Sequence, residues 1–141
     1  MPNFTFNQLQ SVTSQIFTTL GVSPDEGETL GYFLASANLV GHDSHGVIRI
    51  PQYIQHIKRG EIKLGMKIEL LNETATTAVI NGNWGFGQVV TKQATELAVT
   101  KAIENGLGCV TVQKNNHVGR LSDYAYLIAE KSCIGILMVN G

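Results

Sequence analysis

Residues 77–113 decide the fold that we expect, and they read TAVINGNWGFGQVVTKQATELAVTKAIENGLGCVTVQ. The stretch begins with a short apolar strand pattern that ends in Asn-Gly, a strong turn signal. A glycine-rich segment then leads into helical periodicity, which predicts a helix over residues 88–105 with Gly106 as its C-terminal cap. The apolar residues 109–112 predict a second strand. A strand, a helix and a strand in this order indicate an α/β (α+β) fold.

Polar and apolar segments alternate after residue 113. Residues 114–120 predict a polar loop and residues 122–131 a further helix. The short apolar run Ile134–Val139 predicts a strand that is buried on both faces. Cys109 and Cys133 lie in apolar segments, so we expect both to be buried thiols outside any disulfide framework.

The first third of the chain has a helical pattern. Thr5 and Gln8 form a capping-box signature, and Ser23 followed by proline predicts the start of a second helix. The pattern changes to strands in the sixties. We therefore expect a helical N-terminal module over residues 1–63 and an α/β module over residues 64–141.

Composition narrows the classes of function. Hydrophobic residues make up 43% of the 141 residues and charged residues 15%, so the chain can bury a core. Ten Lys and Arg side chains against eleven Asp and Glu give no cationic surplus for nucleic acid. No apolar run approaches the ~20 residues that cross a bilayer, so we expect no membrane association. Two cysteines and an N-terminus without a basic region favour a cytoplasmic location.

The densest group of chemically active side chains lies in residues 41–53, GHDSHGVIRIPQY. A histidine can exchange a proton near neutral pH, and Arg49, four residues after the second histidine, can bind a carboxylate with two hydrogen bonds. Tyr53 lies a further four residues on. An ordinary helix connection with solvated histidines is about equally compatible with this pattern. A Ser-His-Asp triad and a metal site are poorly supported, because the residues are too close in sequence and no second His/Cys cluster exists.

Two further segments could contact a ligand. Residues 114–120, KNNHVGR, follow a strand and precede a helix, the position at which open α/β sheets commonly bind ligands. An ordinary polar loop is again about equally compatible. The glycines at 82, 85 and 87 have the spacing G-x-x-G-x-G, which differs from the Rossmann dinucleotide fingerprint. Trp84 and Phe86, which lie between these glycines, could pack on neighbouring elements or on a ligand, and core packing is favoured.

The three segments GHDSHGVIRIPQY, NGNWGFGQ and NNHVGRLSDYAYLIAE, in that order, resemble the type-2 malate/L-lactate dehydrogenase family. The resemblance runs from about Thr5 to Gly141. It implies an oxidoreductase that transfers a hydride between NAD or NADP and a small 2-hydroxy or 2-oxo acid. It also implies a helical module followed by part of a non-Rossmann cofactor-binding α/β domain, and a homodimer in the complete protein.

The resemblance assigns roles residue by residue. His45 is the leading acid/base candidate and His117 the second. Three residues are expected to bind or line the substrate, namely Ser44, Arg49 and Tyr53. Asn115 and Asn140 are cofactor-binding candidates, and no metal is expected.

Family members are typically more than twice as long as this chain, so the resemblance implies an N-terminal portion with an incomplete α/β domain. The alternative from another class is a short, non-catalytic relative that binds a ligand or a partner. The residues do not distinguish NAD from NADP or one 2-hydroxy acid from another.

Overall fold

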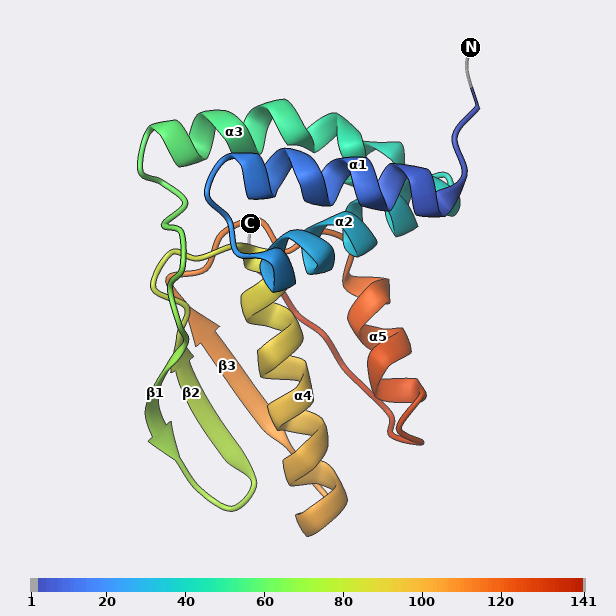
Figure 1. The fold of residues 1–141 in the computed structure, drawn as a ribbon. Coiled ribbons are helices and arrows are strands. Elements are labelled where there is room, and N and C mark those ends of the chain that lie inside the picture. The colour runs from blue at the N-terminus through green and yellow to red at the C-terminus, as the bar shows by residue number, and fades with distance from the viewer. Residues whose placement is uncertain (1–2, 141) are drawn as a thin grey trace. The chain divides into compact units, whose positions relative to one another are not determined.

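The computed structural model describes residues 3–140 and contains two compact units, one that ends at Gly65 and one that begins at Met66 (Figure 1). The division expected from the sequence lies between residues 63 and 64. The first unit is helical and the second combines helices with a sheet. The mixed α/β fold class is therefore confirmed.

The N-terminal unit consists of three helices and two short 3₁₀ turns. They are α1 (Phe6–Thr19), α2 (Pro24–Leu39), η1 (Asp43–His45), η2 (Val47–Arg49) and α3 (Ile50–Lys58). Helices α1 and α2 pack against each other. They approach so closely that a Cβ added at Gly31 would lie 2.6 Å from the carbonyl oxygen of Gln10. The core of this unit contains Phe17, Val22, Leu30, Phe33, Leu34, Ala35, Ala37, Tyr53 and Ile62.

The predicted caps of the first two helices are confirmed. Thr5 Oγ1 accepts a hydrogen bond from the Gln8 backbone N–H at 3.3 Å, and Gln8 Oε1 accepts one from the Thr5 backbone N–H at 2.9 Å. Ser23 Oγ accepts a bond from the Glu26 backbone N–H at 3.4 Å. These bonds satisfy N–H groups that a helix start leaves without intrahelical partners, and so determine where α1 and α2 begin.

The second unit has the predicted order of strand, helix and strand. Its elements are β1 (Glu69–Glu73), β2 (Thr77–Asn81), α4 (Gly87–Asn105), β3 (Cys109–Gln113) and α5 (Leu121–Ala129). In the sheet order β1-β2-β3, β1 and β2 are antiparallel, while β2 and β3 are parallel and joined by α4. Parallel pairing places the carboxyl ends of β2 and β3 at one edge of the sheet, the usual position of ligand sites in such folds.

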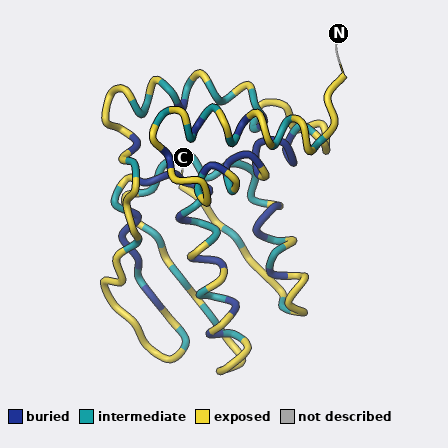
Figure 2. The backbone as a smooth tube through the Cα atoms, viewed as in Figure 1, coloured by how far each residue is buried: buried dark blue, intermediate teal, exposed yellow. Residues whose placement is uncertain are grey.

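The core of the second unit lies between the sheet and its helices. Helix α4 packs on β2 and β3, and α5 packs beside α4. Figure 2 shows buried positions recurring along α4 and at the centre of β2. Gly106 caps α4 with a φ of +80°, as predicted. The buried apolar side chains are those of Ala78, Ile80, Phe86, Val90, Ala94, Val99, Tyr124 and Ile128.

Two predictions about burial are wrong. The segment Ile134–Val139 forms no strand, and Ile134, Ile136 and Met138 expose most of their side chains. A buried strand needs a neighbouring strand and cover on both faces, and residues 3–140 supply neither to this segment. Cys109 is exposed and Cys133 half-buried, because exposure alternates along β3 and Cys109 lies on its more exposed face.

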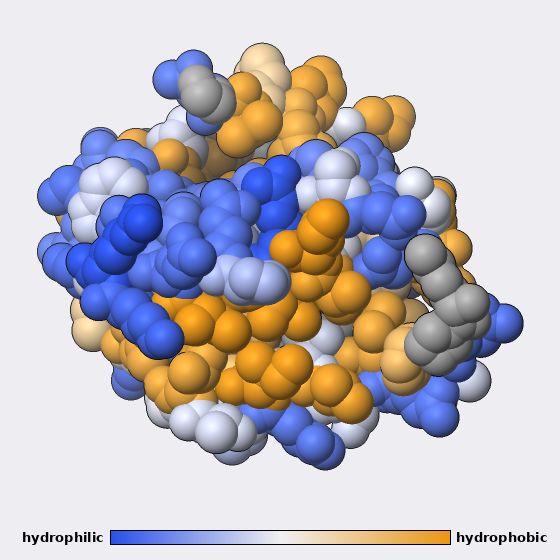
Figure 3. All heavy atoms as spheres, turned by 90° about the horizontal axis from the view of Figure 1, so that it is seen from above, coloured by the Kyte–Doolittle hydropathy of each residue, from blue (hydrophilic) through white to orange (hydrophobic). Residues whose placement is uncertain are grey.

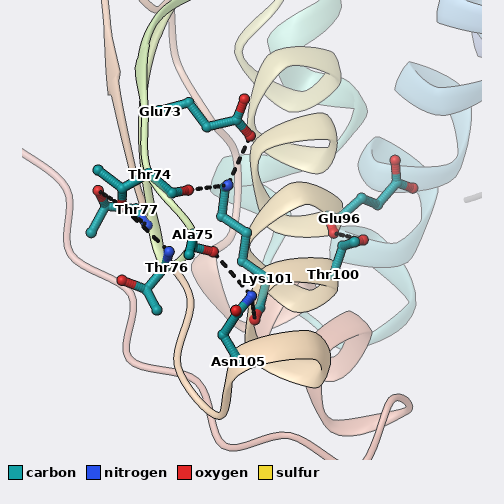
Figure 4. A network of polar contacts seen from close by, with 9 residues as sticks. All are labelled: Glu73, Thr74, Ala75, Thr76, Thr77, Glu96, Thr100, Lys101 and Asn105. Carbon is teal, nitrogen blue, oxygen red and sulfur yellow. Dashed lines mark hydrogen bonds and ion pairs between the residues drawn. The ribbon is translucent and has the colours of Figure 1, made fainter.

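A buried lysine ties α4 to the connection between β1 and β2 (Figure 4). Lys101 Nζ lies 2.7 Å from Glu73 Oε1 and donates a 2.7 Å bond to the Thr74 carbonyl oxygen. One turn further along α4, Asn105 Nδ2 donates to the Ala75 carbonyl oxygen at 3.1 Å. Only 6% of Lys101 is accessible to solvent, so these two oxygens replace most of the water that would otherwise solvate its ammonium group.

Replacing Lys101 with methionine is expected to lower the free energy of unfolding by about 1–2 kcal/mol, because the Thr74 carbonyl loses its donor and Glu73 its partner. Urea unfolding followed by circular dichroism measures this loss. Lys92→Met is the matched control on the same helix, since Lys92 forms only an exposed pair with Glu96 at 3.8 Å. That control is expected to change stability by under about 0.5 kcal/mol. Equal losses in the two variants would contradict the role of the buried pair.

The surface of the first unit carries several exposed apolar side chains. Figure 3 shows apolar atoms gathered in a band among polar ones on the face that carries α1 and α3. Large exposed apolar side chains of this unit are Phe4, Val12, Tyr32, Leu39, Val40 and Ile48. Apolar areas of this kind often mark interaction surfaces. None of the helices described here is both long and apolar enough to span a bilayer.

Candidate active site

The loop between α2 and α3 is folded into the turns η1 and η2. Gly41 begins it with a φ of +76°, a left-handed conformation that favours glycine. Backbone bonds from His45 N to the His42 carbonyl oxygen and from Arg49 N to the Gly46 carbonyl oxygen close the two turns, each at 3.0 Å. The loop predicted from the sequence is thus an ordered structure that gives its side chains defined directions.

His45 is oriented by its neighbours in this loop. Its Nδ1 shares a 3.0 Å hydrogen bond with Ser44 Oγ, and its ring meets the ring of His42 edge-on at 4.5 Å between centroids. The imidazole is half-buried, and Ser44 and His42 are exposed. The bond at Nδ1 and the edge-on contact with His42 therefore orient the imidazole within the loop.

Arg49 is anchored by part of its guanidinium group. Its Nε donates a 2.6 Å bond to the Ser44 carbonyl oxygen, and its Nη1 donates a 2.7 Å bond to Gln52 Oε1. The structure shows no hydrogen bond from Nη2 to any residue in the range 3–140. The side chain is half-buried and its guanidinium group is held in place, so its remaining N–H donors are available to a carboxylate.

Tyr53 lies in the first turn of α3 and only 2% of it is accessible to solvent. Its ring packs against that of Phe17 with centroids 6.2 Å apart. Tyr53 is therefore part of the packed surroundings of the loop in this unit. The prediction that it lines a substrate pocket stays a prediction.

The second unit brings together two segments that the sequence separates. The turn 82–86 follows β2 and the loop 114–117 follows β3, at the shared edge of the parallel strands. The backbone N–H of Gly82 donates to the Gln113 carbonyl oxygen at 2.9 Å, and that of Trp84 donates to the Lys114 carbonyl oxygen at 2.8 Å. The two segments thus form one structure at the position where α/β folds bind ligands.

Asn115 and Asn116 hold this junction from the side of the loop. Asn116 Nδ2 donates to the carbonyl oxygens of Trp84 and Gly85, both at 2.9 Å. Asn115 Nδ2 donates to Thr91 Oγ1, and its Oδ1 accepts from the Asn116 backbone N–H, both at 3.1 Å. Both ends of the Asn115 amide are engaged within the protein, which leaves its predicted contact with a cofactor as a prediction.

His117 follows these asparagines and is half-buried. The backbone on which it lies is packed against the start of α4, because a Cβ added at Gly87 would lie 2.2 Å from the His117 carbonyl oxygen. Beyond it, Tyr124 donates a hydrogen bond to the Val118 carbonyl oxygen, and Arg120 forms an ion pair with the buried Asp123. The loop is therefore tied to both α4 and α5.

Trp84 does not pack in the core, contrary to the favoured expectation. Its side chain is 43% exposed, whereas Phe86 is buried as predicted. Asn83 and Trp84 have φ values of +51° and +59°, which non-glycine residues adopt rarely and at a cost. The turn that produces these angles directs the Trp84 ring away from the core.

Asn115 and Asn140 stay predicted contacts of a cofactor. A Cβ added at Gly87 would meet the carbonyl oxygens of Asn116 and His117, so this glycine is packed against the loop 114–117. Asn140 is exposed. Residues 3–140 also contain no group of three or more His, Cys, Asp or Glu side chains arranged to hold a metal ion.

Two residues organise these loops through contacts that the sequence does not predict. Asn38, in the last turn of α2, bonds to both Asp43 and Val47. Asn116 joins its loop to a turn 31 positions earlier in the chain. An amide at the end of an otherwise apolar helix segment is the only sequence signal for Asn38.

The sequence matches the family described as malate/L-lactate dehydrogenase over residues 4–141. It is 37% identical to the malate dehydrogenase of Pyrococcus abyssi over 95% of this chain, and 38% identical to the malate/(S)-sulfolactate dehydrogenase of Methanothermus fervidus over 93%. The structure is similar to that of malate dehydrogenase from Pyrococcus horikoshii OT3, with a TM-score of 0.90 and 34% identity over 92% of this chain.

The matches cover only part of each relative. The chain spans 37% of the P. abyssi protein, 39% of the M. fervidus protein and 37% of the P. horikoshii structure. Members of the family are NAD(P)-dependent dehydrogenases of 2-hydroxy acids. Together the sequence match and the shared fold show that this chain belongs to the malate/L-lactate dehydrogenase family.

Proposed function

We propose that this chain is the N-terminal portion of an NAD(P)-dependent dehydrogenase that interconverts a small 2-hydroxy acid, such as malate or lactate, and its 2-oxo acid. The observation that carries the proposal is the ordered loop 41–49, in which a half-buried histidine and an anchored arginine are held by short hydrogen bonds. These are the two groups that acid/base chemistry on a carboxylate substrate needs.

His45 is the proposed acid and base. Oxidation of a 2-hydroxy acid removes the hydroxyl proton, which a neutral imidazole accepts, and reduction returns that proton to the carbonyl oxygen. The hydrogen bond between Nδ1 and Ser44 Oγ orients the imidazole in the loop. His117 remains the second acid/base candidate, since its loop is fixed at the carboxyl edge of the sheet.

Arg49 is the proposed anchor for the substrate carboxylate. Its Nε and Nη1 bonds hold the guanidinium plane, and a preorganised donor loses little freedom when the acid binds. Ser44 is expected to orient His45 or to contact the substrate directly.

The cofactor is NAD or NADP, and its nicotinamide supplies or accepts the hydride when bound. Asn115 and Asn140 are the cofactor contacts proposed within this chain, and most of the groups that bind the nucleotide are expected in the part of the family length that this chain does not span. We therefore propose the activity for the complete polypeptide. This term means the protein, as made in its source cell, that contains this chain.

The proposal is tested by following the absorbance of NADH and NADPH at 340 nm while the complete polypeptide meets a panel of 2-oxo acids, including oxaloacetate, pyruvate and sulfopyruvate. Oxidation of at least one cofactor that depends on one of these acids supports the proposal. A complete polypeptide that binds such acids without any turnover would favour the alternative, a non-catalytic relative.

Replacing Arg49 with alanine is expected to lower kcat/KM for the 2-oxo acid about 10- to 100-fold, the value of a charged hydrogen-bonded contact of about 1.5–3 kcal/mol. The change should appear mainly as a raised KM for the acid. Arg59→Ala is the matched control, because Arg59 is an exposed arginine at the end of α3 with one long contact of 3.9 Å to Glu61. An unchanged KM in Arg49→Ala would remove Arg49 from the binding site.

We also propose that the complete polypeptide is a homodimer. The exposed apolar side chains of the N-terminal unit support an interface between copies. Light scattering of the complete polypeptide at micromolar concentration should give twice its chain mass, and a monomer mass would contradict this proposal.

A further inference from the structure

We infer that Asn38 is a positioning residue for His45, holding the two turns of the loop 41–49 around the imidazole. The inference rests on the proposed function, because it assigns Asn38 a part in the same reaction. Asn38 acts through other residues and is not given a contact with the substrate.

The side chain of Asn38 bridges the two turns. Its Nδ2 donates a 2.6 Å hydrogen bond to Asp43 Oδ1, and its Oδ1 accepts a 2.8 Å bond from the Val47 backbone N–H. Asp43 is the first residue of η1 and Val47 the first residue of η2. One amide on the rigid helix α2 therefore fixes both turns, and His45 lies between them in the chain.

Gly46 shows how tightly the amide fits. A Cβ added at this position would lie 2.1 Å from Asn38 Oδ1 and 2.5 Å from Asn38 Cγ. The φ of Gly46 is −88°, which any residue adopts, so the backbone itself does not require glycine here. The absence of a side chain at position 46 therefore serves to admit the Asn38 amide.

The effect of Asn38 reaches the proposed reacting groups through η1. Ser44 lies in that turn, and it both bonds to His45 Nδ1 and accepts the Arg49 Nε bond on its carbonyl oxygen. Losing the bridge displaces the histidine and the arginine together. Because errors of about 1 Å in such groups can cost about 100-fold in rate, the bridge has a kinetic effect beyond its contribution to folding.

The first test exchanges the two polar partners in the complete polypeptide. Asn38→Asp keeps an acceptor for the Val47 N–H but places a carboxylate against Asp43, which opens the bridge by like-charge repulsion. We expect kcat/KM for the 2-oxo acid to fall about tenfold or more, with the KM for NAD(P)H unchanged within about twofold. Adding Asp43→Asn restores the bond in reversed order, because the new amide at position 43 can donate to the new carboxylate at position 38. The double variant should return kcat/KM to within about threefold of the wild type.

The second test uses Gly46. Gly46→Ala in the wild type should lower kcat/KM by a similar factor, because the methyl group occupies the space of the Asn38 amide. The same change in an Asn38→Ala background should cost little more, since the amide is already gone. Asn7→Ala is the matched control, an exposed asparagine on α1 that should leave kcat/KM unchanged.

Protection of the Val47 amide against hydrogen exchange gives a readout that needs no turnover. It should fall in Asn38→Ala and persist in the exchanged pair Asn38→Asp with Asp43→Asn. If the wild type shows no turnover, both the proposed function and the kinetic role of Asn38 are disproved. If Val47 exchange is unchanged in Asn38→Ala, only the bridge between the two turns is disproved.

With an active wild type, an unchanged kcat/KM in Asn38→Asp overturns the positioning role and leaves the proposed function standing. The positioning role is likewise overturned if the double variant Asn38→Asp with Asp43→Asn has a kcat/KM no higher than that of Asn38→Asp alone. A loss confined to thermal stability, with both kinetic constants retained, would assign Asn38 a purely structural role.

Discussion

Replacing His45 with alanine is expected to lower kcat of the complete polypeptide about 10²- to 10⁴-fold, the usual contribution of a positioned acid/base group. The reason is that the substrate oxygen then has no partner for its proton, while Arg49 can still bind the carboxylate. The KM for the acid should change far less than kcat. Steady-state rates at saturating cofactor measure both constants.

The control for this prediction is another histidine of the same unit. His56 lies in the last turn of α3, half-buried, with its Nδ1 3.7 Å from Glu61 Oε2. His56→Ala removes the same group without touching the loop, and should leave kcat within about twofold of the wild type. If His45→Ala retained wild-type turnover while His117→Ala lost it, the leading acid/base role would pass to His117.

Replacing Gly87 with alanine is expected to destabilise the second unit by about 3 kcal/mol, at the upper end of the usual cost of overpacking. The added methyl group would lie 2.2 Å from the His117 carbonyl oxygen and 2.4 Å from that of Asn116. Both are backbone atoms, so the loop itself must move. Thermal or urea unfolding of the chain measures the loss.

Gly85→Ala is the matched control in the same turn. Its nearest neighbour would be the Gly82 carbonyl oxygen at 3.3 Å, a contact that small shifts relieve. The control should therefore lose much less stability. Equal losses at the two positions would show that the turn, and not its packing on the His117 loop, limits stability.

Local signals account for the parts of the fold that the sequence predicts well. The bond partners of Thr5 and Ser23 lie three residues away, and Gly106 ends α4 through its own backbone conformation. Such features depend on neighbours in the chain, so the helices and the strand–helix–strand order can be predicted without knowledge of the tertiary structure.

The wrong predictions concern whether a side chain or segment is covered by other parts of the protein. Trp84 and Cys109 have residue types that are commonly buried, yet one lies on a left-handed turn and the other on the more exposed face of β3. The apolar run Ile134–Val139 has the composition of a core strand but no strand beside it among the described residues. Composition indicates that a segment suits burial and does not identify its partner.

In the candidate site, too, local features can be predicted from the sequence, whereas contacts between distant residues cannot. The polar loops can be located from the sequence, because their residue types and flanking glycines are local. The bonds that shape them are not local: Asn116 reaches Trp84 across 32 positions, and Asn38 reaches Val47 across nine. These contacts depend on helix packing and strand pairing, which a single sequence does not reveal.

We propose above that the polypeptide containing this chain transfers a hydride between a nicotinamide and the second carbon of an acid. The most direct measurement uses NADH deuterated at C4 on the transferable face, with mass spectrometry of the hydroxy acid formed from oxaloacetate or pyruvate by the complete polypeptide. We predict one deuterium at C2 of the malate or lactate. Hydroxy acid without that deuterium, or no hydroxy acid from any 2-oxo acid of the panel, would contradict the proposed hydride transfer.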